Sequence, residues 1–314
     1  MGETPMLATP SAATRSRASI DIATLTSSDT HGFEQKLDGI RVWVRYDGGT
    51  TPMTITGRNG TDLSDKFPEL GFGPEGGATN DPWGQPWPKG PFWFDGEIVS
   101  DEGFQVANTR SKAPVNRAHQ GARDHPCRFV AFDVPAYASL PYTARRQILF
   151  TELAPENIVL DASDDVTPMD FIERLRADGA EGVIAKRFTS LYEFGARSKS
   201  WVKFKNLHRI TCIGVGYNAG TGAREEFGAL NLALFNNDHS AVINIGTVGT
   251  GFSDKDLVEM KTLLDAGKHP IVEIECLNIT NPGRQLRFPV YRGIRADVTI
   301  ADCVESQLDT IPTC

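Results

Sequence analysis

Residues 34–41 read Glu-Gln-Lys-Leu-Asp-Gly-Ile-Arg, and a strand is predicted to begin inside this stretch. From residue 40 to residue 47 the side chains alternate, with Ile, Val, Val and Tyr at the even positions. This period of two predicts a half-buried strand. Lys36 then lies at the edge between a loop and the strand. Its amine is a candidate nucleophile if its surroundings favour the neutral form.

The neighbours of Lys36 suit that chemistry. Positive charge from Arg41 and from a nearby divalent cation would lower the pKa of the amine. Asp38 and Gly39 would let the chain turn tightly around a bound ligand. Taken by itself, the pattern also fits an ordinary surface lysine before a turn, because motifs this short recur by chance.

Patterns on either side of this segment predict a mixture of strands and helices. Gly48-Gly49 favours a hairpin into a second strand that contains Met53 and Ile55. Further strands are expected at 92–99, 128–134, 180–186 and 200–205, a surface loop at 73–91, and helices at about 143–153 and from Pro168 onward. The second helix begins with Thr167-Pro168, has Asp170 at its third position, and presents Phe171, Ile172 and Leu175 as its apolar face.

The pattern changes after about Asn206. Strand-like runs at 210–217, 230–235, 242–248 and 271–279 surround one helix at about 253–266, which has a Ser253–Asp256 cap pair. Short strands with a single helix are typical of a small oligonucleotide-binding (OB) β-barrel. We therefore predict an α+β protein of two domains, residues 1–206 and 207–314, with residues 1–18 as a loose arm.

Composition and charge narrow the class of protein. The 314 residues are 40% apolar and 23% charged, as in soluble globular proteins, and no run approaches a membrane span. Five scattered cysteines without a C-x-x-C pair argue against zinc or a disulfide framework, which favours a reducing cytoplasm. The net charge of −8 argues mildly against a nucleic-acid partner, but residues 186–209 carry seven basic residues and one acid. A local basic field can guide a polyanion, although such runs are often only solvated surface.

Several further segments accompany Lys36 and make a family resemblance specific. Lys36, Asp38, Gly39 and Arg41 satisfy the pattern K-x-D-G-x-R in full. The other segments are Pro-Met-Leu-Ala at 5–8, Gly-Arg-Asn-Gly at 57–60, Phe-Pro-Glu-Leu at 67–70, Phe-Asp-Gly-Glu at 94–97, Phe-Asp at 132–133, Glu-Gly-Val-Ile-Ala-Lys at 181–186 and Trp-Val-Lys-Phe-Lys at 201–205. In order and spacing they resemble the covalent nucleotidyltransferases and, among these, the ATP-dependent DNA ligases.

The C-terminal part resembles the same family more loosely. Residues 248–253 are similar to the turn before the helix of the ligase barrel, and residues 286–297 resemble the last family element, which orients the pyrophosphate during self-adenylation. Val298 stands where that element usually ends in lysine. Arg292 or Arg295 would cover this departure. Because the two are three residues apart on a strand, we expect them on opposite faces, with Arg295 in the place of the family arginine.

The resemblance implies an adenylation domain of antiparallel sheets with flanking helices, followed by the OB-fold barrel. It implies that Lys36 takes AMP from ATP and passes it to a nick in duplex DNA. The implied catalytic residues are Lys36, Arg41, Lys203, Lys205 and Arg295. The implied nucleotide-binding residues are Glu34, Lys36, Arg41, Arg58, Glu97, Phe132, Lys203 and Lys205, and the implied Mg²⁺ ligands are Glu97 and Glu181.

The physical properties of these residues fit those roles. Phe132 offers a ring for adenine to stack on, although core packing would be the first interpretation of the residue alone. Glu34 would border the adenine edge, or else face solvent from a strand. Carboxylates suit a hard cation, and Arg58 is a fixed planar donor for a ribose or phosphate. Lys203 and Lys205 alternate with apolar residues and so face one side, which suits the α-phosphate.

Other members of the superfamily remain as alternatives. An mRNA capping guanylyltransferase shares K-x-D-G and the barrel, whereas an RNA ligase usually lacks this barrel element. An NAD-dependent ligase normally adds an N-terminal module and a four-cysteine zinc site. A non-catalytic nucleic-acid-binding protein would not need Lys36, Glu97 and Glu181. The sequence therefore favours a monomeric cytoplasmic DNA ligase that uses ATP and Mg²⁺ on nicked double-stranded DNA, in replication, repair or recombination.

Overall fold

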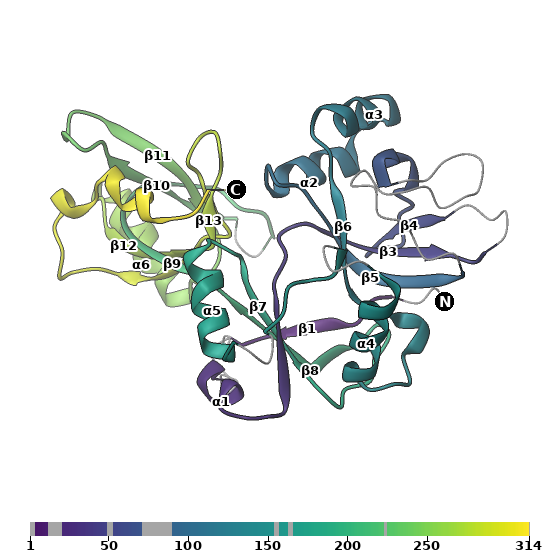
Figure 1. Ribbon diagram of the computed structural model, residues 1–314. Helices are drawn as coiled ribbons and strands as arrows, with labels where there is room; N and C mark the ends of the chain where they lie inside the picture. The colour runs from purple at the N-terminus through teal and green to yellow at the C-terminus, as the bar shows by residue number, and fades with distance from the viewer. Residues whose placement is uncertain are drawn as a thin grey trace. The chain divides into compact units, whose positions relative to one another are not determined.

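The computed structural model describes residues 4–11, 21–48, 53–70, 90–153, 157–162, 166–222 and 225–313. The chain forms two compact units, Met1–Lys205 and Asn206–Cys314 (Figure 1). The expected loop at 73–91, the Gly48-Gly49 turn and the N-terminal arm lie wholly or largely outside the described residues. Within the described part of the chain, no helix is long and apolar enough to cross a membrane.

The first unit contains two four-stranded sheets. One has the order β1-β8-β7-β2 and the other the order β4-β3-β5-β6. Their strands are β1 Leu7–Pro10, β2 His31–Gln35, β3 Ile40–Tyr46, β4 Thr54–Gly57, β5 Phe92–Val99, β6 Arg128–Asp133, β7 Gly182–Arg187 and β8 Arg197–Lys205. Neighbouring strands are antiparallel except for β1, which runs parallel to β8. The expectation of antiparallel sheets is confirmed apart from this edge strand.

In the described residues of the first unit, five α-helices accompany the sheets. They are α1 Ile22–Thr26, α2 Phe104–Lys112, α3 Val115–Asp124, α4 Tyr142–Glu152 and α5 Pro168–Ala177. Helix α5 begins as expected, because the Thr167 side chain accepts a hydrogen bond from the Asp170 N–H. Its buried side chains are the three of the expected apolar face, and they pack with Phe33 and Val183 of β2 and β7.

Alternation also placed β3 correctly. Val42, Val44 and Tyr46 are buried in the core of the second sheet, whereas Arg45 on the opposite face is exposed. The sequence did not predict α2 and α3, because these helices are polar and bury mainly alanine, at Ala107, Ala118 and Ala122. Strand β2, which leads into Lys36, was also missed.

The second unit is a five-stranded antiparallel sheet with one helix. The sheet order is β11-β10-β9-β12-β15, formed by β9 His208–Asn218, β10 Ala229–Phe235, β11 Val242–Val248, β12 Ile271–Cys276 and β15 Val290–Ile294. Strands β13 Asn278–Ile279 and β14 Leu286–Arg287 form a separate pair. Among residues 225–313 and the other described parts of the chain, no pairing joins β11 to β15, so no closed barrel is found.

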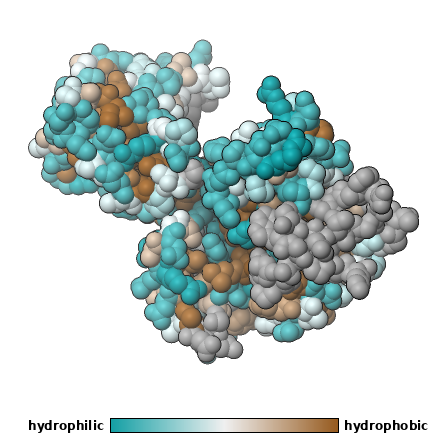
Figure 2. All heavy atoms as spheres, turned by 45° about the horizontal axis from the view of Figure 1, so that its top comes forward, coloured by the Kyte–Doolittle hydropathy of each residue, from teal (hydrophilic) through white to brown (hydrophobic). Residues whose placement is uncertain are grey.

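Helix α6, Asp254–Asp265, lies between β11 and β12 in the sequence. Ser253 and Asp256 form the expected capping box, in which each side chain accepts from the other residue's backbone N–H. Met260 is fully buried in the core of this unit, with Leu257 and Leu264 packed against it. On the face drawn in Figure 2 hydrophilic residues predominate and apolar residues lie in separate patches, as expected when each unit has its own core.

Candidate functional site

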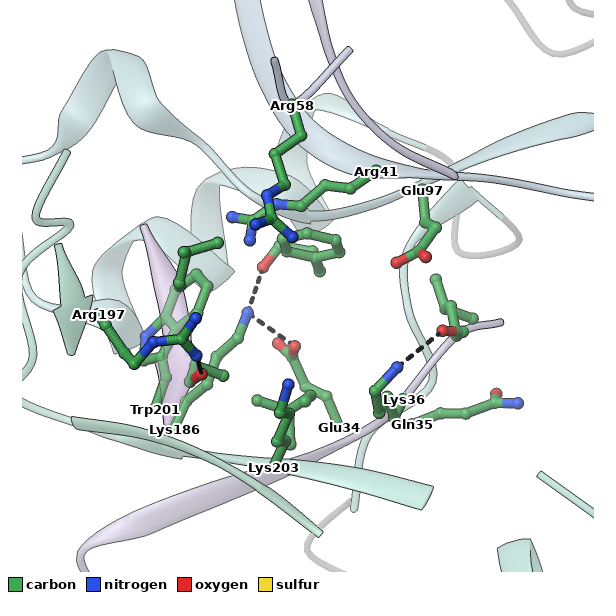
Figure 3. Close-up of a pocket in the computed structure, with 15 residues that line it drawn as sticks. Glu34, Gln35, Lys36, Arg41, Arg58, Glu97, Lys186, Arg197, Trp201 and Lys203 are labelled. Atoms are coloured by element: carbon green, nitrogen blue, oxygen red, sulfur yellow. Dashed lines mark hydrogen bonds and ion pairs between the residues drawn. The ribbon is translucent and has the colours of Figure 1, made fainter. Parts of the chain in front are cut away.

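A pocket in the first unit lies between its two sheets and collects side chains from all eight strands or the residues that directly follow them. It is lined by Leu7, Ala8, Glu34, Gln35, Lys36, Leu37, Arg41, Arg58, Glu97, Phe132, Ile184, Lys186, Arg197, Trp201 and Lys203. Six of these residues are basic and two are acidic, so the pocket favours an anionic ligand although the whole chain is acidic. Figure 3 shows Lys36 and Glu97 at one side and Lys186 beside Glu34.

Lys36 follows β2 directly and points into this pocket. Its backbone N–H donates to the Gly182 carbonyl at 2.8 Å, which fixes the residue against β7. Its amine donates to the Glu181 carboxylate, and Lys205 Nζ lies 2.9 Å from the other oxygen of Glu181. The Lys36 side chain is 19% exposed and that of Glu181 is 5% exposed. The amine is therefore reachable from the pocket but is held by a carboxylate shared between two lysines.

Gly39 lets the loop after Lys36 approach strand β5. A Cβ at this position would lie 2.3 Å from the Ile98 carbonyl oxygen, so a larger residue would push the loop away. The Gly39 N–H donates to Glu97 Oε1 at 3.1 Å. Burial and the nearby Glu181 carboxylate raise the pKa of Glu97 to about 7, even though the charge of Lys36 opposes this.

Arg41 is held by a buried carboxylate. Its guanidinium donates two hydrogen bonds to Asp95, at 3.0 and 2.6 Å, and the Tyr192 hydroxyl donates to the same carboxylate at 2.5 Å. Burial alone would lower the pKa of Arg41, but Asp95 raises it above its ordinary value. The guanidinium lies 5.1 Å from the centroid of the Phe132 ring. Phe132 is half-buried and lines the pocket, so its ring is not wholly taken up by core packing.

Glu34 is 1% exposed, so the interpretation of this residue as a solvent-facing strand side chain is wrong. The Tyr142 hydroxyl donates to its Oε1 at 2.7 Å, and Lys186 Nζ lies 2.7 Å from its Oε2. Lys186 also donates to the Phe132 carbonyl at 2.7 Å. Burial lowers the pKa of Lys186 despite the neighbouring carboxylates of Glu34 and Asp133.

The remaining cations of the pocket come from strand β8 and the loop after β4. Lys203, Trp201 and Arg197 all line the pocket, as the period of two along one strand requires. Burial first, and then the charges of Lys36 and Lys205, lower the pKa of Lys203. Arg58 is exposed and reaches the pocket from the opposite sheet.

Arg295 belongs to the second unit, and its ion pairs show that the expected placement of Arg292 and Arg295 on opposite faces of a strand is wrong. It pairs with Asp297 at 2.7 Å and with Glu273 at 3.2 Å, whereas Arg292 pairs with Glu275. Arg209 Nη1 and Nε lie 3.5 and 3.6 Å from Glu273 and Glu275, respectively, so these two acids share one face of β12. Arg292 and Arg295 therefore lie on the same side, not on opposite faces. The reason is a β-bulge: Tyr291 and Gly293 each lie opposite a residue of β12, whereas Arg292 between them has no residue opposite it in the strand register.

The structure thus brings together Lys36, Glu34, Arg41, Arg58, Glu97, Phe132, Glu181, Lys203 and Lys205 in one unit. The sequence alone did not indicate roles for five further residues: Asp95, Tyr142, Lys186, Tyr192 and Arg197. Asp95 and Lys186 lie inside two of the family motifs, residues 94–97 and 181–186. Arg197 lies on the same face of β8 as Lys203, six residues earlier. Tyr142 and Tyr192 carried no local signal, because their partners are 108 and 97 residues away in the sequence.

Together the fold and the pocket define a protein with a basic pocket between two sheets, in which Lys36 lies near the carboxylates of Glu97 and Glu181. The family described as the ATP-dependent DNA ligase domain matches residues 5–205, which cover nearly all of the first unit. The chain belongs to this family.

Known relatives and structures agree with that membership. The DNA ligase of Thermococcus onnurineus is 27% identical over 93% of this chain, and this chain spans 55% of its length. The multifunctional non-homologous end joining DNA repair protein LigD of Mycobacterium tuberculosis is 29% identical over 74% of this chain and 29% of its own length. The chain therefore spans about half or less of these relatives.

Solved structures support the fold. A Lig E DNA ligase structure has a TM-score of 0.62 and 20% identity, and the match covers 94% of this chain and 100% of that one. A structure designated Pmar-Lig_Pre has a TM-score of 0.61 and 21% identity, covering 93% of this chain and 68% of that one. At these identities the likeness concerns the fold alone.

Proposed function

We propose that this protein is an ATP-dependent DNA ligase that seals nicks between a 3′-hydroxyl and a 5′-phosphate through a lysyl-AMP on Lys36. The observation that carries the proposal is the position of Lys36. Its amine enters a basic pocket in which the carboxylates of Glu97 and Glu181 lie at one end and a buried Glu34 and an aromatic ring at the other. Membership of the ATP-dependent DNA ligase domain family supports the same reaction.

In the first step the neutral amine of Lys36 attacks the α-phosphorus of ATP. A nitrogen–phosphorus bond forms, the bond to the bridging oxygen breaks, and pyrophosphate leaves with the electron pair. The proton on the amine has an acceptor at hand, since Glu181 already receives a hydrogen bond from it. Lys203, which lines the pocket, and Lys205 would stabilise the negative charge that grows on the phosphate. The AMP then passes to the DNA 5′-phosphate, and the 3′-hydroxyl displaces it.

Glu97 and Glu181 fit a divalent cation. The Glu181 carboxylate raises the pKa of Glu97, and a bound cation would relieve that repulsion. The described residues hold no group of three or more acidic, His or Cys side chains placed as metal ligands. The other positions around Mg²⁺ would therefore fall to phosphate oxygens and water, as is usual for this ion. When bound, Mg²⁺ would neutralise charge on the phosphates and on Glu181, which favours the neutral amine of Lys36.

We further propose that the second unit is an OB-type domain that contacts the DNA and assists the first step. Five antiparallel strands with one helix after the third strand match a partly open five-stranded barrel of this kind. In this proposal the first unit is the adenylation domain. Arg295 would leave its acidic partners to orient the pyrophosphate, which an arginine can do through paired hydrogen bonds.

The decisive experiment is covalent labelling with α-³²P-labelled nucleotides, followed by a denaturing gel. Wild-type protein should be labelled by ATP with Mg²⁺ and should seal a nicked duplex. Lys36→Ala should lose at least about a thousandfold in labelling, since it removes the nucleophile itself. The exposed Lys199→Ala on β8 is the matched control and should label normally. Mass spectrometry that places AMP on a residue other than Lys36, or labelling by GTP alone, would refute the proposal.

A further inference from the structure

Glu34, Tyr142 and Lys186 form a polar cluster at the end of the pocket where we propose that the adenine base binds. They come from strand β2, the first turn of α4 and strand β7, respectively. Each oxygen of the Glu34 carboxylate has one partner: the Tyr142 hydroxyl on Oε1 and the Lys186 amine on Oε2, both at 2.7 Å. Glu34 and Lys186 line the pocket, whereas Tyr142 lies behind them with 3% of its surface exposed. Figure 3 shows Lys186 directed at Glu34 along one pocket wall.

Lys186 acts on Glu34 rather than on a ligand. Its ammonium group contacts Glu34 Oε2 and the Phe132 carbonyl oxygen, each at 2.7 Å, and Asp133 lies 3.9 Å away as a second, longer ion pair. The rings of Phe132, Tyr142 and Trp201 surround it, with centroids at 4.9, 5.1 and 4.3 Å. With 1% of its surface exposed, the amine is enclosed by these partners. It fixes the charge and the orientation of the carboxylate instead.

Tyr142 cannot leave the carboxylate easily. Its N–H donates to the Ser190 carbonyl at 2.8 Å, and its ring packs so closely on Gly32 that a Cβ there would lie 3.2 Å from the ring edge. Burial and the Glu34 charge raise the pKa of the Tyr142 hydroxyl well above its ordinary value, so the group remains a donor. Arg146 Nη1 lies 3.7 Å from Glu34 Oε1 and has no hydrogen-bond partner in the described chain, which adds positive charge behind the carboxylate.

We propose that Tyr142 and Lys186 are positioning residues that hold the Glu34 carboxylate as a rigid acceptor, so that the pocket selects a purine with an amino group at position 6 over one without it. This inference rests on the proposed function. A carboxylate that already receives one bond on each oxygen keeps lone pairs for one more donor. An exocyclic amine can use them, whereas the carbonyl of guanine or a bare ring carbon cannot. The fixed geometry determines how strongly a wrong base is rejected.

The test measures the rate of lysyl-nucleotide formation against the concentration of ATP, GTP and purine riboside triphosphate, which lacks the 6-amino group. For Tyr142→Phe we expect the KM for ATP to rise about tenfold and the preference for ATP over purine riboside triphosphate to fall about tenfold, the order expected for one hydrogen bond to a charged group. The maximal rate should change less than about threefold, because Tyr142 does not face the phosphates.

Tyr137→Phe is the matched control. Tyr137 is 46% exposed in the turn just before α4, and its loss of a hydroxyl should alter neither constant. An unchanged preference among the three nucleotides in a folded Tyr142→Phe protein would overturn the inference. An equal loss of maximal rate with all three would also overturn it, since that result describes a structural role.

If Tyr142→Phe does not fold, the wild-type protein still provides a test. Equal use of ATP and purine riboside triphosphate would show that no acceptor reads the amine, and would overturn the inference, whereas a preference of about a hundredfold would support it. Failure of the proposed function gives a different result, since wild-type protein would then form no lysyl-nucleotide with any triphosphate.

Discussion

At the scale of single residues, Glu97 is a carboxylate whose pKa is shifted by its surroundings. It sits on β5 beside the loop of Lys36, accepts one backbone hydrogen bond from Gly39, and is close enough to Glu181 for the two charges to oppose each other. Its pKa of about 7 lies above the ordinary value of 4.5, with burial as the main cause. Without a cation, the folded protein therefore carries a carboxylate that it would stabilise better as the neutral acid.

This shift predicts a pH dependence of stability. Between pH 4.5 and 7 the unfolded chain ionises at Glu97 before the folded chain does, so the free energy of unfolding falls as the pH rises. The contribution is present below about pH 4.5 and lost above about pH 7, and amounts to at most about 3 kcal/mol. Glu97→Gln should remove this contribution in urea unfolding with EDTA at pH 5 and pH 8. The exposed Glu152→Gln is the control. An equal pH effect in wild type and Glu97→Gln would contradict the assignment.

At the scale of elements, helix α4 is tied to the second sheet by a buried ion pair. Arg145 and Asp133 are both 0% exposed and meet through two hydrogen bonds of 2.6 and 3.1 Å. Arg145 also donates to the carbonyls of Leu140 and Ser190, which hold the chain on either side. Because α4 supplies Tyr142, which donates to Glu34, this pair supports a pocket residue indirectly.

Breaking this pair on one side should be costly. Arg145→Met leaves Asp133 buried with only the more distant Lys186 at 3.9 Å, and we expect it to lower the free energy of unfolding by about 3–5 kcal/mol. Gln147→Met, on the exposed face of the same helix, should change stability by less than about 0.5 kcal/mol. Chemical denaturation of both proteins measures the difference. A loss below about 1 kcal/mol for Arg145→Met would mean that the helix does not depend on this pair.

At the scale of the whole molecule, the distribution of basic side chains differs from the net charge of the chain. The chain has a net charge of −8, yet basic side chains outnumber acidic ones around the pocket of the first unit. In the second unit the arginines of β15 and the residue after it are paired with Glu273, Glu275 and Asp297. Cations are paired with carboxylates in both units, and the difference is that those of the first unit, such as Lys36 and Arg41, also line the pocket.

This difference predicts a split between the two chemical stages. Arg295→Ala should slow lysyl-AMP formation by at least about a hundredfold, the scale expected when a donor to a leaving group is removed, while joining of a nick that already carries AMP is spared. Arg292→Ala, on the same side of the sheet, is the matched comparison and should have a smaller effect. Val298→Lys should speed the first step or leave it unchanged. Equal loss of both stages in Arg295→Ala would assign this segment to DNA binding or folding.

Local pattern was enough for much of the chain. The alternation in β3, the caps of α5 and α6, and the apolar face of α5 follow from which side chains must be buried within a few residues, so the sequence alone predicted them correctly. The order of short motifs around Lys36 likewise identified the family. The sequence did not predict helices α2 and α3, because they bury small alanines and an ion-paired arginine instead of an apolar stripe.

Only the tertiary structure decided which side chains meet. Lys36 pairs with Glu181 across 145 residues, and Tyr142 reaches Glu34 across 108. Such contacts depend on the register between strands, and a shift of one residue turns a side chain to the other face of the sheet. The bulge at Arg292 shows this directly, because one extra residue brought two arginines to the same side against the simple strand period. Burial patterns act locally, whereas register is set by the packing of the whole sheet.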